Sequence, residues 1–382
     1  MRLIGFLALT LIALAPATVY SFDDCSTLFA PQLEAGLNGQ NSRQFLENNL
    51  LLNKNAQRSA ATYRQNSNRD YKTYVQFFGK FFDLKMQALR GRGKWLDSGS
   101  GRALAPLEKA QELGIQVIPV SGQDFWSPLL SQVKTILAKR QKRLFRPLAK
   151  LTTTGYQGGF GKYIVKSVEN LRSDDIAFAA HALGLKSEIF SGELLLRPKD
   201  MSEKDFDIEL TAQLKEIDRR MVELTRDGLF QYTVGFSEKV IPTLKTQVDL
   251  ITDLYGAYHY SVLRAHLLEL YYASLTDSGT AYVLLGDEST WKKDVIRTET
   301  GDVPFIDYLL KTYPDNFSVT TSFHRGPFSR VPVKESILVM TKTPNLSELK
   351  LLFDFNPDEI EFTEARDGYK SATKIIYYPR RP

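Results

Sequence analysis

Lys94-Trp-Leu-Asp-Ser-Gly-Ser-Gly-Arg-Ala103 is the stretch that decides the fold. Its apolar start and terminal acid indicate a buried strand that ends at Asp97, and the glycines that follow favour a tight turn into a helix. Gly99 and Gly101 let the main chain approach a bound molecule closely, and the helix that follows presents free N–H groups there. The stretch therefore predicts a ligand site at a strand end, with a plain strand-to-helix corner as the alternative.

The segments that follow alternate between apolar strands and helices. We expect a helix from about Ala103 and a second strand over residues 115–121. A strand, a crossover helix and a second strand form the unit of a parallel sheet. Ligands bind beyond the carboxyl ends of such strands, which is where Asp97 and Ser121 fall.

Further strands and helices are predicted from periodicity along the rest of the chain. The predicted strands are residues 229–235, 247–253, 280–285, 317–322 and 335–342, and the predicted helices are residues 71–89, 173–185, 205–227 and 261–275. The last two strands are close enough in sequence to pair antiparallel. A glycine-rich segment, residues 152–161, lacks a lysine-serine signature and is interpreted as a connection or lid rather than a phosphate site.

Three consecutive landmarks give the chain a family resemblance. Asp97-Ser-Gly-Ser-Gly101 matches the pattern DxGxG, Val248 to Tyr260 is similar to a fourth strand and its loop, and Leu275 to Leu285 resembles the turn into a fifth strand. In this order, over residues 70–343, they resemble the class I S-adenosylmethionine-dependent methyltransferases. The resemblance implies an α/β fold, a seven-stranded, mostly parallel Rossmann-like sheet with the last strand inserted antiparallel, and S-adenosyl-L-methionine as cofactor.

The resemblance also implies the roles of two parts of the donor site. Gly99 and Gly101 are expected to pass close to the methionine portion of the cofactor. Asp97 is expected to help bind its amino group, directly or through water.

The chain departs from the family pattern on the nucleoside side. The family places an acid after the second strand to hold the ribose hydroxyls, whereas Ser121 stands here, with Gln123 or Asp124 as alternatives. After the third strand, where the resemblance places the adenine, Glu238 is the polar residue available to bind it.

The loop after the fourth strand holds the candidates for the acceptor side. Methyl transfer depends on an in-line nucleophile held close to the methyl carbon in a dry pocket, so no universal catalytic residue is required. Asp253, Tyr255, Tyr258 and His259 are placed to orient an acceptor, with His259 as a base. Equally, the tyrosines could simply pack and His259 be structural. The sequence contains neither HExxH nor GxSxG, so no metal site and no serine hydrolase is predicted.

The first residues predict export. One arginine, an apolar run and small residues form a signal peptide pattern over residues 1–21. The alternative is an uncleaved anchor, which the apolar run disfavours because it is shorter than a spanning helix requires. No later segment is apolar enough to span a bilayer. Cys25 is the only cysteine, which excludes an internal disulfide and a cysteine-based zinc cluster.

The charge pattern singles out one segment. A net charge of +5 over 382 residues does not by itself indicate nucleic acid, but residues 134–150 are rich in lysine and arginine. This segment could bind an acidic partner or membrane surface, or form a solvated helix face.

We divide the chain by these patterns. The expected parts are a signal peptide (1–21), an N-terminal helical region (22–90), a methyltransferase-like domain (91–343) with a helical insertion at about 126–228, and a C-terminal extension (344–382).

Three functions remain open from the sequence. The first is an exported methyltransferase, periplasmic or secreted, with an unknown acceptor. The second is a non-catalytic secreted binding protein that uses the same scaffold, with residues 134–150 or the insertion holding a partner. The third is an aminopropyl transferase, for which Asp253 is the one supporting acid.

Overall fold

The structure is a computed structural model that describes residues 69–101, 103–122, 153–154, 164–165, 202–324, 333–364 and 370–380. Several sequence predictions lie outside these residues: the signal peptide, Cys25, Asp124, the basic segment 134–150 and the helix at 173–185. Of the glycine-rich segment, only β3 (Thr153–Thr154) is described, paired antiparallel with β4 (Ile164–Val165).

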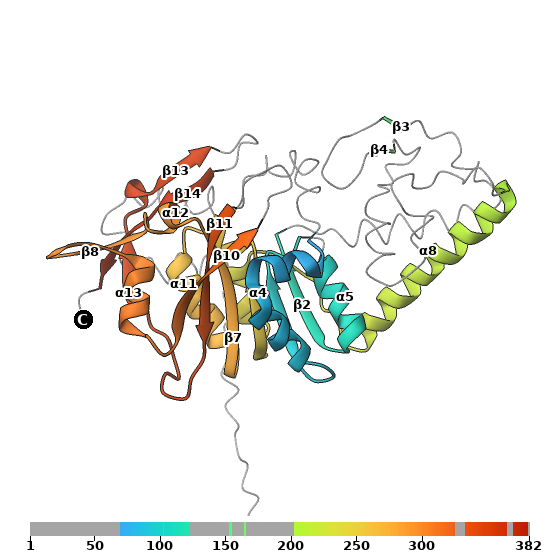
Figure 1. The fold of residues 1–382 in the computed structure, drawn as a ribbon, viewed down its shortest axis with the longest axis horizontal. Helices are drawn as coiled ribbons and strands as arrows, with labels where there is room; N and C mark the ends of the chain where they lie inside the picture. The colour runs from blue at the N-terminus through green and yellow to red at the C-terminus, as the bar shows by residue number, and fades with distance from the viewer. Residues whose placement is uncertain are drawn as a thin grey trace, which may run out of the picture.

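A seven-stranded sheet forms the centre of the molecule (Figure 1). Its strands are β1 (Lys94–Ser98), β2 (Gln116–Ser121), β5 (Thr233–Val234), β6 (Val248–Asp253), β7 (Leu275–Gly286), β10 (Phe317–His324) and β11 (Val333–Thr341), in the spatial order β10-β11-β7-β6-β1-β2-β5. β11 runs antiparallel to both of its neighbours, whereas the five strands from β7 to β5 are parallel. The predicted fold class, with the last strand inserted antiparallel, is confirmed.

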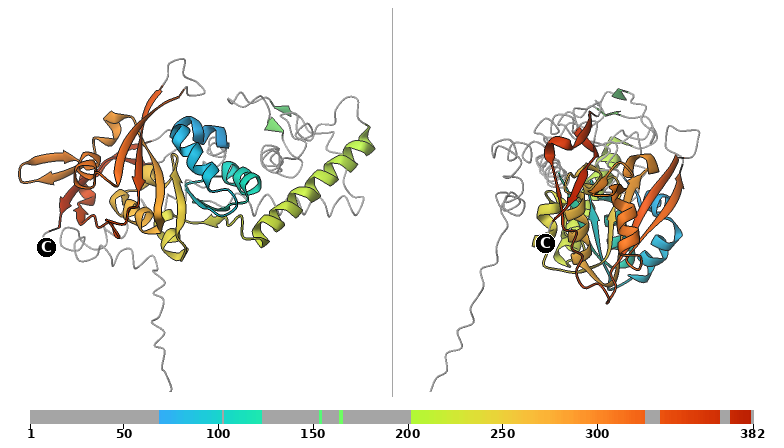
Figure 2. Two further views of the ribbon diagram at one scale, coloured as in Figure 1. Left: turned by 60° about the horizontal axis from the view of Figure 1, so that its bottom comes forward. Right: turned by 90° about the vertical axis from the view of Figure 1, so that its left-hand side faces the viewer.

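Alternate residues of each strand face opposite sides of this sheet and enter two different cores. Trp95, for example, packs with α4 (Tyr71–Ala88) and α5 (Leu104–Leu113), whereas Leu96 packs with α11 (Arg264–Ser274) and α13 (Phe305–Thr312). Burial on both faces is the reason the parallel strands read as nearly continuous apolar runs. Figure 2 shows helices covering both faces of the sheet.

Two predicted element boundaries are wrong. The strand expected over residues 229–235 is β5 alone, preceded by one isolated bridge between Phe230 and Val117. The helix expected over residues 261–275 begins at Arg264 and ends at Ser274, and the residues expected to form a turn belong to the long strand β7. The main chain of Ser278 and Gly279 bonds to Lys342 after β11, which extends the strand beyond what local periodicity indicates.

The C-terminal extension builds a second sheet against the first. β15 (Ile376–Pro379) pairs with β12 (Phe353–Phe355) on one side and on the other with β8 (Val295–Thr298), which forms a hairpin with β9 (Gly301–Pro304). β13 (Glu361–Glu364) and β14 (Lys370–Lys374) form a separate hairpin. Leu351, Ile375 and Tyr377 share one core with the central strands. The extension therefore completes the core on that face instead of folding apart from it.

Short helices connect these elements. They are α9 (Ser237–Val240), η2 (Ile241–Thr243), α10 (Ala257–Tyr260), α12 (Glu288–Trp291) and η3 (Pro357–Glu359).

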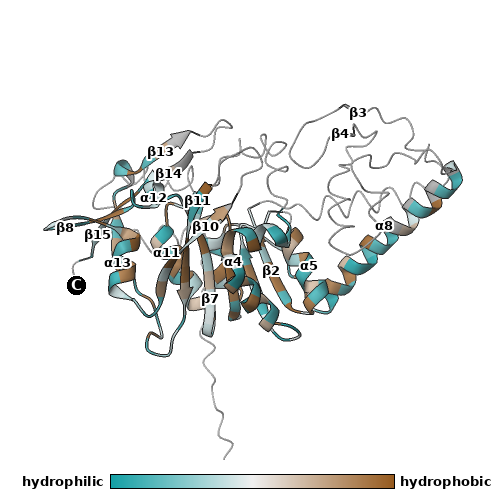
Figure 3. Cartoon of the chain, in the orientation of Figure 1, coloured by the Kyte–Doolittle hydropathy of each residue, from teal (hydrophilic) through white to brown (hydrophobic). Residues whose placement is uncertain are grey.

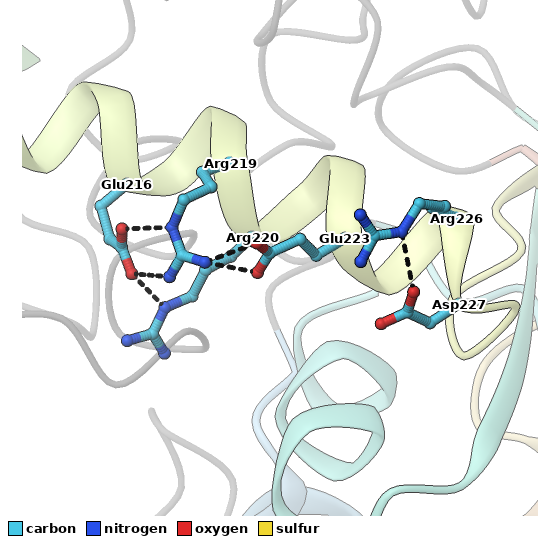
Figure 4. Close-up of polar contacts among 6 residues, drawn as sticks. All are labelled: Glu216, Arg219, Arg220, Glu223, Arg226 and Asp227. Carbon is cyan, nitrogen blue, oxygen red and sulfur yellow. Dashed lines mark hydrogen bonds and ion pairs between the residues drawn. The ribbon is translucent and has the colours of Figure 1, made fainter.

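α8 (Glu203–Arg226) is the helix predicted over residues 205–227, and it projects away from the sheet (Figures 1 and 3). Ser202 caps its start by accepting a hydrogen bond from the amide of Asp205. Near its C-terminal end Ile217 and Met221 are buried in the core, while Arg219 lies on the outer side between Glu216 and Glu223 (Figure 4). The charges on this exposed side are paired along the helix, as expected for a solvated face.

Candidate functional site

The candidate site lies where β1 and β6 end side by side. The chain leaves β1 for α5, on one face of the sheet, and leaves β6 for α11, on the other face. Such a reversal of strand order is the point at which open α/β sheets bind ligands, beyond the carboxyl ends of the strands. Asp97, Ser98 and Asp253 are the residues that the two strands bring to this point.

The turn after β1 requires its glycines. Gly99 and Gly101 have φ angles of 78° and 58°, in the left-handed region that glycine adopts at no steric cost. The amides of Gly99 and Ser100 both donate to the carbonyl of Val120, each at 2.9 Å, which fastens the turn to β2. The carbonyl of Gly101 accepts from the Tyr232 hydroxyl at 2.9 Å. The turn predicted from the sequence is therefore present, and it is held from both sides.

The same turn touches the loop after β6. A Cβ atom on Gly99 would lie 2.2 Å from the Cα of Gly256, and one on Gly256 would lie 2.1 Å from the carbonyl oxygen of Ser98. The backbones of the turn after β1 and of the loop after β6 therefore meet directly. The close approach predicted for Gly99 serves this contact within the chain.

Asp97 is buried behind the turn and is enclosed by hydroxyl groups. Its Oδ2 accepts from Tyr74 and its Oδ1 accepts from Thr252, both at 2.6 Å, and Trp95 Nε1 donates in turn to Thr252. Burial raises the pKa of Asp97 to about 7, while the bonds from Thr252 and Tyr74 and the charge of Arg69 act in the opposite direction. The carboxyl group faces these side chains, and Asp97 is only 1% exposed.

Arg69 is a residue of this site that was not predicted from the sequence. Its Nη1 donates to the carbonyl of Gly99 at 3.4 Å, its own carbonyl accepts from the amide of Ala105 at 3.2 Å, and its guanidinium lies 5.8 Å from the ring centre of Tyr255. It therefore touches the glycine turn, the N-terminal turn of α5 and the loop after β6. A single arginine ahead of a helix has no local sequence signal, so only the folded contacts identify it.

A buried chain of hydroxyl groups connects β1 to β6. Ser98 Oγ lies 2.7 Å from Ser237 Oγ and 2.6 Å from the hydroxyl of Tyr271, which lies 2.5 Å from Asp253 Oδ2. Tyr271 has one proton, and an ionised carboxylate can only accept, so Tyr271 donates to Asp253 and accepts from Ser98.

Asp253 is turned into its own loop. Besides the bond from Tyr271, its Oδ1 accepts from the amide of Gly256 at 2.9 Å and its Oδ2 from the amide of Tyr258 at 2.7 Å. Burial raises its pKa to about 6, against the lowering by Tyr271 and the two amides. In this arrangement the carboxyl group shapes the loop that was predicted to orient an acceptor.

Tyr255 and His259 lie together on that loop. Tyr255 has a φ of 49°, its hydroxyl donates to Glu335 Oε1 at 2.5 Å, and its ring centre lies 5.8 Å from that of His259. Burial, with the nearby charges of Arg264 and Arg69, lowers the pKa of His259 to about 4, so its imidazole is neutral at neutral pH. Glu335 comes from β11 and had no signal in the sequence.

The residues predicted for the nucleoside side are only partly described. Ser121 is buried at the end of β2, and its carbonyl accepts from the amide of Gly235 at 2.8 Å. Glu238, on α9, is buried and accepts a short hydrogen bond from Ser261, and burial raises its pKa. The structure thus brings Asp97, Gly99 and Asp253 together but engages Glu238 with the segment before α11.

No family model and no curated protein matches the chain. Among solved structures it is similar to a precorrin-6y C5,15-methyltransferase from Geobacter metallireducens (8% identity over 72% of this chain and 90% of that chain, TM-score 0.32). It is also similar to an rRNA methylase from Streptococcus thermophilus (9% identity, 68% and 93%, TM-score 0.29) and a SAM-dependent methyltransferase from Archaeoglobus fulgidus (12%, 72% and 100%, TM-score 0.29). The fold assignment rests on the chain's own strand order.

Proposed function

We propose that this chain is an exported S-adenosylmethionine-dependent methyltransferase whose acceptor is not identified. The observation that carries the proposal is the glycine turn at the end of β1, placed where the strand order reverses in a seven-stranded sheet with an antiparallel inserted strand. Export is supported by the leader pattern of residues 1–21. No helix in the described part of the chain is long and apolar enough to cross a membrane.

The charges around the turn fit the amino-acid end of the proposed cofactor. An α-amino acid carries a carboxylate and an ammonium, and this turn has the Arg69 guanidinium on one side and Asp97 behind it. Arg69 would hold the carboxylate through charge-assisted hydrogen bonds. Asp97, with a pKa of about 7, would be drawn to its ionised form by an ammonium close to it. Gly99 and Gly101 would supply the main-chain contacts, and Ser121 would face the ribose.

The acceptor side would be the loop after β6. When bound, S-adenosyl-L-methionine supplies an electrophilic methyl group on a sulfonium. Tyr255 and His259 would line the approach of the nucleophile, and the neutral His259 imidazole is in the form that can accept a proton. Asp253 would act by holding the loop in place through the amides of Gly256 and Tyr258.

Calorimetry with S-adenosylhomocysteine tests the donor site. We expect saturable binding to the mature protein at micromolar concentration, as for typical enzyme ligands (about 1 μM to 1 mM). Arg69→Gln should weaken this binding by about tenfold or more, because a charge-assisted hydrogen bond contributes about 1.5 to 3 kcal/mol.

Methylthioadenosine is the matched control ligand, because it lacks the amino-acid end. Its affinity should be the same for the wild-type protein and Arg69→Gln. If neither S-adenosylmethionine nor S-adenosylhomocysteine binds, the enzyme proposal fails and the scaffold is a binding protein. If both ligands lose affinity equally in Arg69→Gln, the role given to Arg69 is wrong.

A further inference from the structure

Arg264 joins three separate parts of the chain at the first residue of α11. Its guanidinium donates to Asp294 Oδ2 at 2.6 Å, to the carbonyl of Ala372 at 2.5 Å and to the carbonyl of Tyr258 at 3.1 Å, with a longer bond of 3.4 Å to the carbonyl of His259. The side chain is buried, with 9% of it exposed. A buried guanidinium with its donors distributed in this way fixes each partner relative to the others.

The partners of Arg264 belong to the loop after β6, which we call the acceptor loop, to the segment just before β8 and to the C-terminal extension. Tyr258 and His259 are on α10, Asp294 precedes β8, and Ala372 is on β14. Asp294 uses its other oxygen to accept from the amide of Ile375 at 2.9 Å. One ion pair therefore ties the loop after β6 to the last strands of the chain.

The acceptor loop needs support of this kind. Tyr255 adopts a left-handed φ of 49°, which costs a residue with a side chain about 1 to 2 kcal/mol. α10 is a single turn of four residues without a side-chain cap. Asp253 binds the loop through two amide groups, and Arg264 binds it through two carbonyl groups. The loop is thus held from both sides of its backbone.

We propose that Arg264 is a positioning residue for the acceptor side of the site, and that the C-terminal extension acts through it as part of the functional unit. This inference rests on the proposed function. It gives the β13–β14 hairpin and the end of the chain a role in presenting Tyr255 and His259, beyond completing a core.

Amide hydrogen exchange on Arg264→Lys tests this. Lysine keeps the charge but cannot reach three parts of the chain at once. We expect the amides of Gly256, Tyr258 and Ser261 to exchange about tenfold faster or more, the effect of losing a buried hydrogen bond to a charged group. The amides of Gly99 and Ser100, in the turn after β1, should be unchanged.

Arg380→Lys is the matched control. Arg380 also pairs with an aspartate, with its Nε 2.8 Å from Asp354 Oδ1, but it has no bond to the acceptor loop among the described contacts. Exchange of the loop amides should be the same as in the wild-type protein. Equal acceleration in Arg264→Lys and Arg380→Lys, or no acceleration in Arg264→Lys, overturns the proposal.

Two further measurements separate positioning from general destabilisation. The His259 imidazole should titrate closer to its ordinary range in Arg264→Lys, because the loosened loop admits water, and a purely structural role would leave this titration unchanged in the folded protein. Asp294→Asn, which retains the acceptor for Ile375, should show the same two effects and replaces Arg264→Lys if that variant does not fold. In both variants the affinity for S-adenosylhomocysteine should stay within about twofold of the wild-type value. Absence of binding to the wild-type protein would count against the proposed function. Amide exchange of the loop needs no ligand, so it tests the role of Arg264 separately.

Discussion

The loops after β1 and β6 are built around two buried aspartates that are held in different ways. Asp97 and Asp253 are each 1% exposed, at the ends of adjacent parallel strands, and burial raises the pKa of both. Asp97 is bound by the hydroxyls of Tyr74 and Thr252, which are 23 and 155 residues away. Asp253 is bound by two amides of its own loop, three and five residues away, as well as by the hydroxyl of Tyr271.

Asp253 therefore maintains the shape of its own loop, whereas Asp97 is held by distant parts of the fold. The amides of Gly256 and Tyr258 depend on Asp253 as an acceptor, so the shape of the loop depends on that carboxyl group. The glycine turn after β1 is fastened through the carbonyl of Val120 and does not depend on Asp97. Asp97 is therefore not needed to hold the turn after β1, whereas Asp253 is needed to hold the loop after β6.

The largest effect is expected where the two loops touch. Gly99→Ala places a methyl group against the Gly256 backbone at a φ of 78°, and we expect a loss of at least about 3 kcal/mol in the free energy of unfolding. Gly91→Ala is the control, because Gly91 has a φ of 76° and open space around it. It should cost only the left-handed strain, about 1 to 2 kcal/mol.

Urea unfolding of both variants measures the difference. If Gly99→Ala is no more destabilising than Gly91→Ala, the backbone contact between the two loops does not exist in solution.

Asparagine substitutions distinguish the two aspartates directly. Asp253→Asn should cost about 1 to 3 kcal/mol, because one amide of the loop loses its acceptor. Asp97→Asn should cost less at about pH 8, because no amide of the turn depends on Asp97 and because the higher pKa of Asp97 makes its buried charge the costlier of the two.

The pH dependence of unfolding shows whether each carboxyl group contributes more or less to stability as pH rises. An acid whose pKa is raised in the folded state binds more protons there, so its contribution to stability falls as pH rises from the unfolded value to the folded one. For Asp97 this window runs from 3.8 to about 7, and for Asp253 from 3.8 to about 6. Asp97→Asn should therefore compare more favourably with the wild-type protein at about pH 8 than at about pH 5. If the unfolding free energies of Asp97→Asn and the wild-type protein differ by the same amount across this window, the pKa of Asp97 is not raised in the folded state.

The smallest effect should come from the tyrosines that donate to each carboxyl group. Tyr74→Phe leaves Asp97 with Thr252 alone, whereas Tyr271→Phe leaves Asp253 with two amides. Each should cost about 1 kcal/mol. Carboxyl titration by NMR should show the pKa of Asp97 rising further in Tyr74→Phe than that of Asp253 in Tyr271→Phe, and the reverse order would contradict the difference between the loops.

The sequence by itself determined the elements and the turn. Alternation of apolar runs with helical periodicity located β1, β2, β6, β7, β10, β11, α5 and α8, because these patterns are local. The turn could be predicted from its glycines because left-handed φ angles favour glycine. The antiparallel insertion of the last strand came from the family resemblance, since periodicity holds no information on which strands are neighbours.

Only the tertiary structure decided how the site is held. Arg69, Thr252, Glu335 and Arg264 reach it from a segment before α4, from β6, from β11 and from the start of α11. Each is a single polar residue with no surrounding pattern, and its partners lie elsewhere along the chain. Burial gives these contacts their strength by excluding water, and burial at this edge exists only once the strands are assembled.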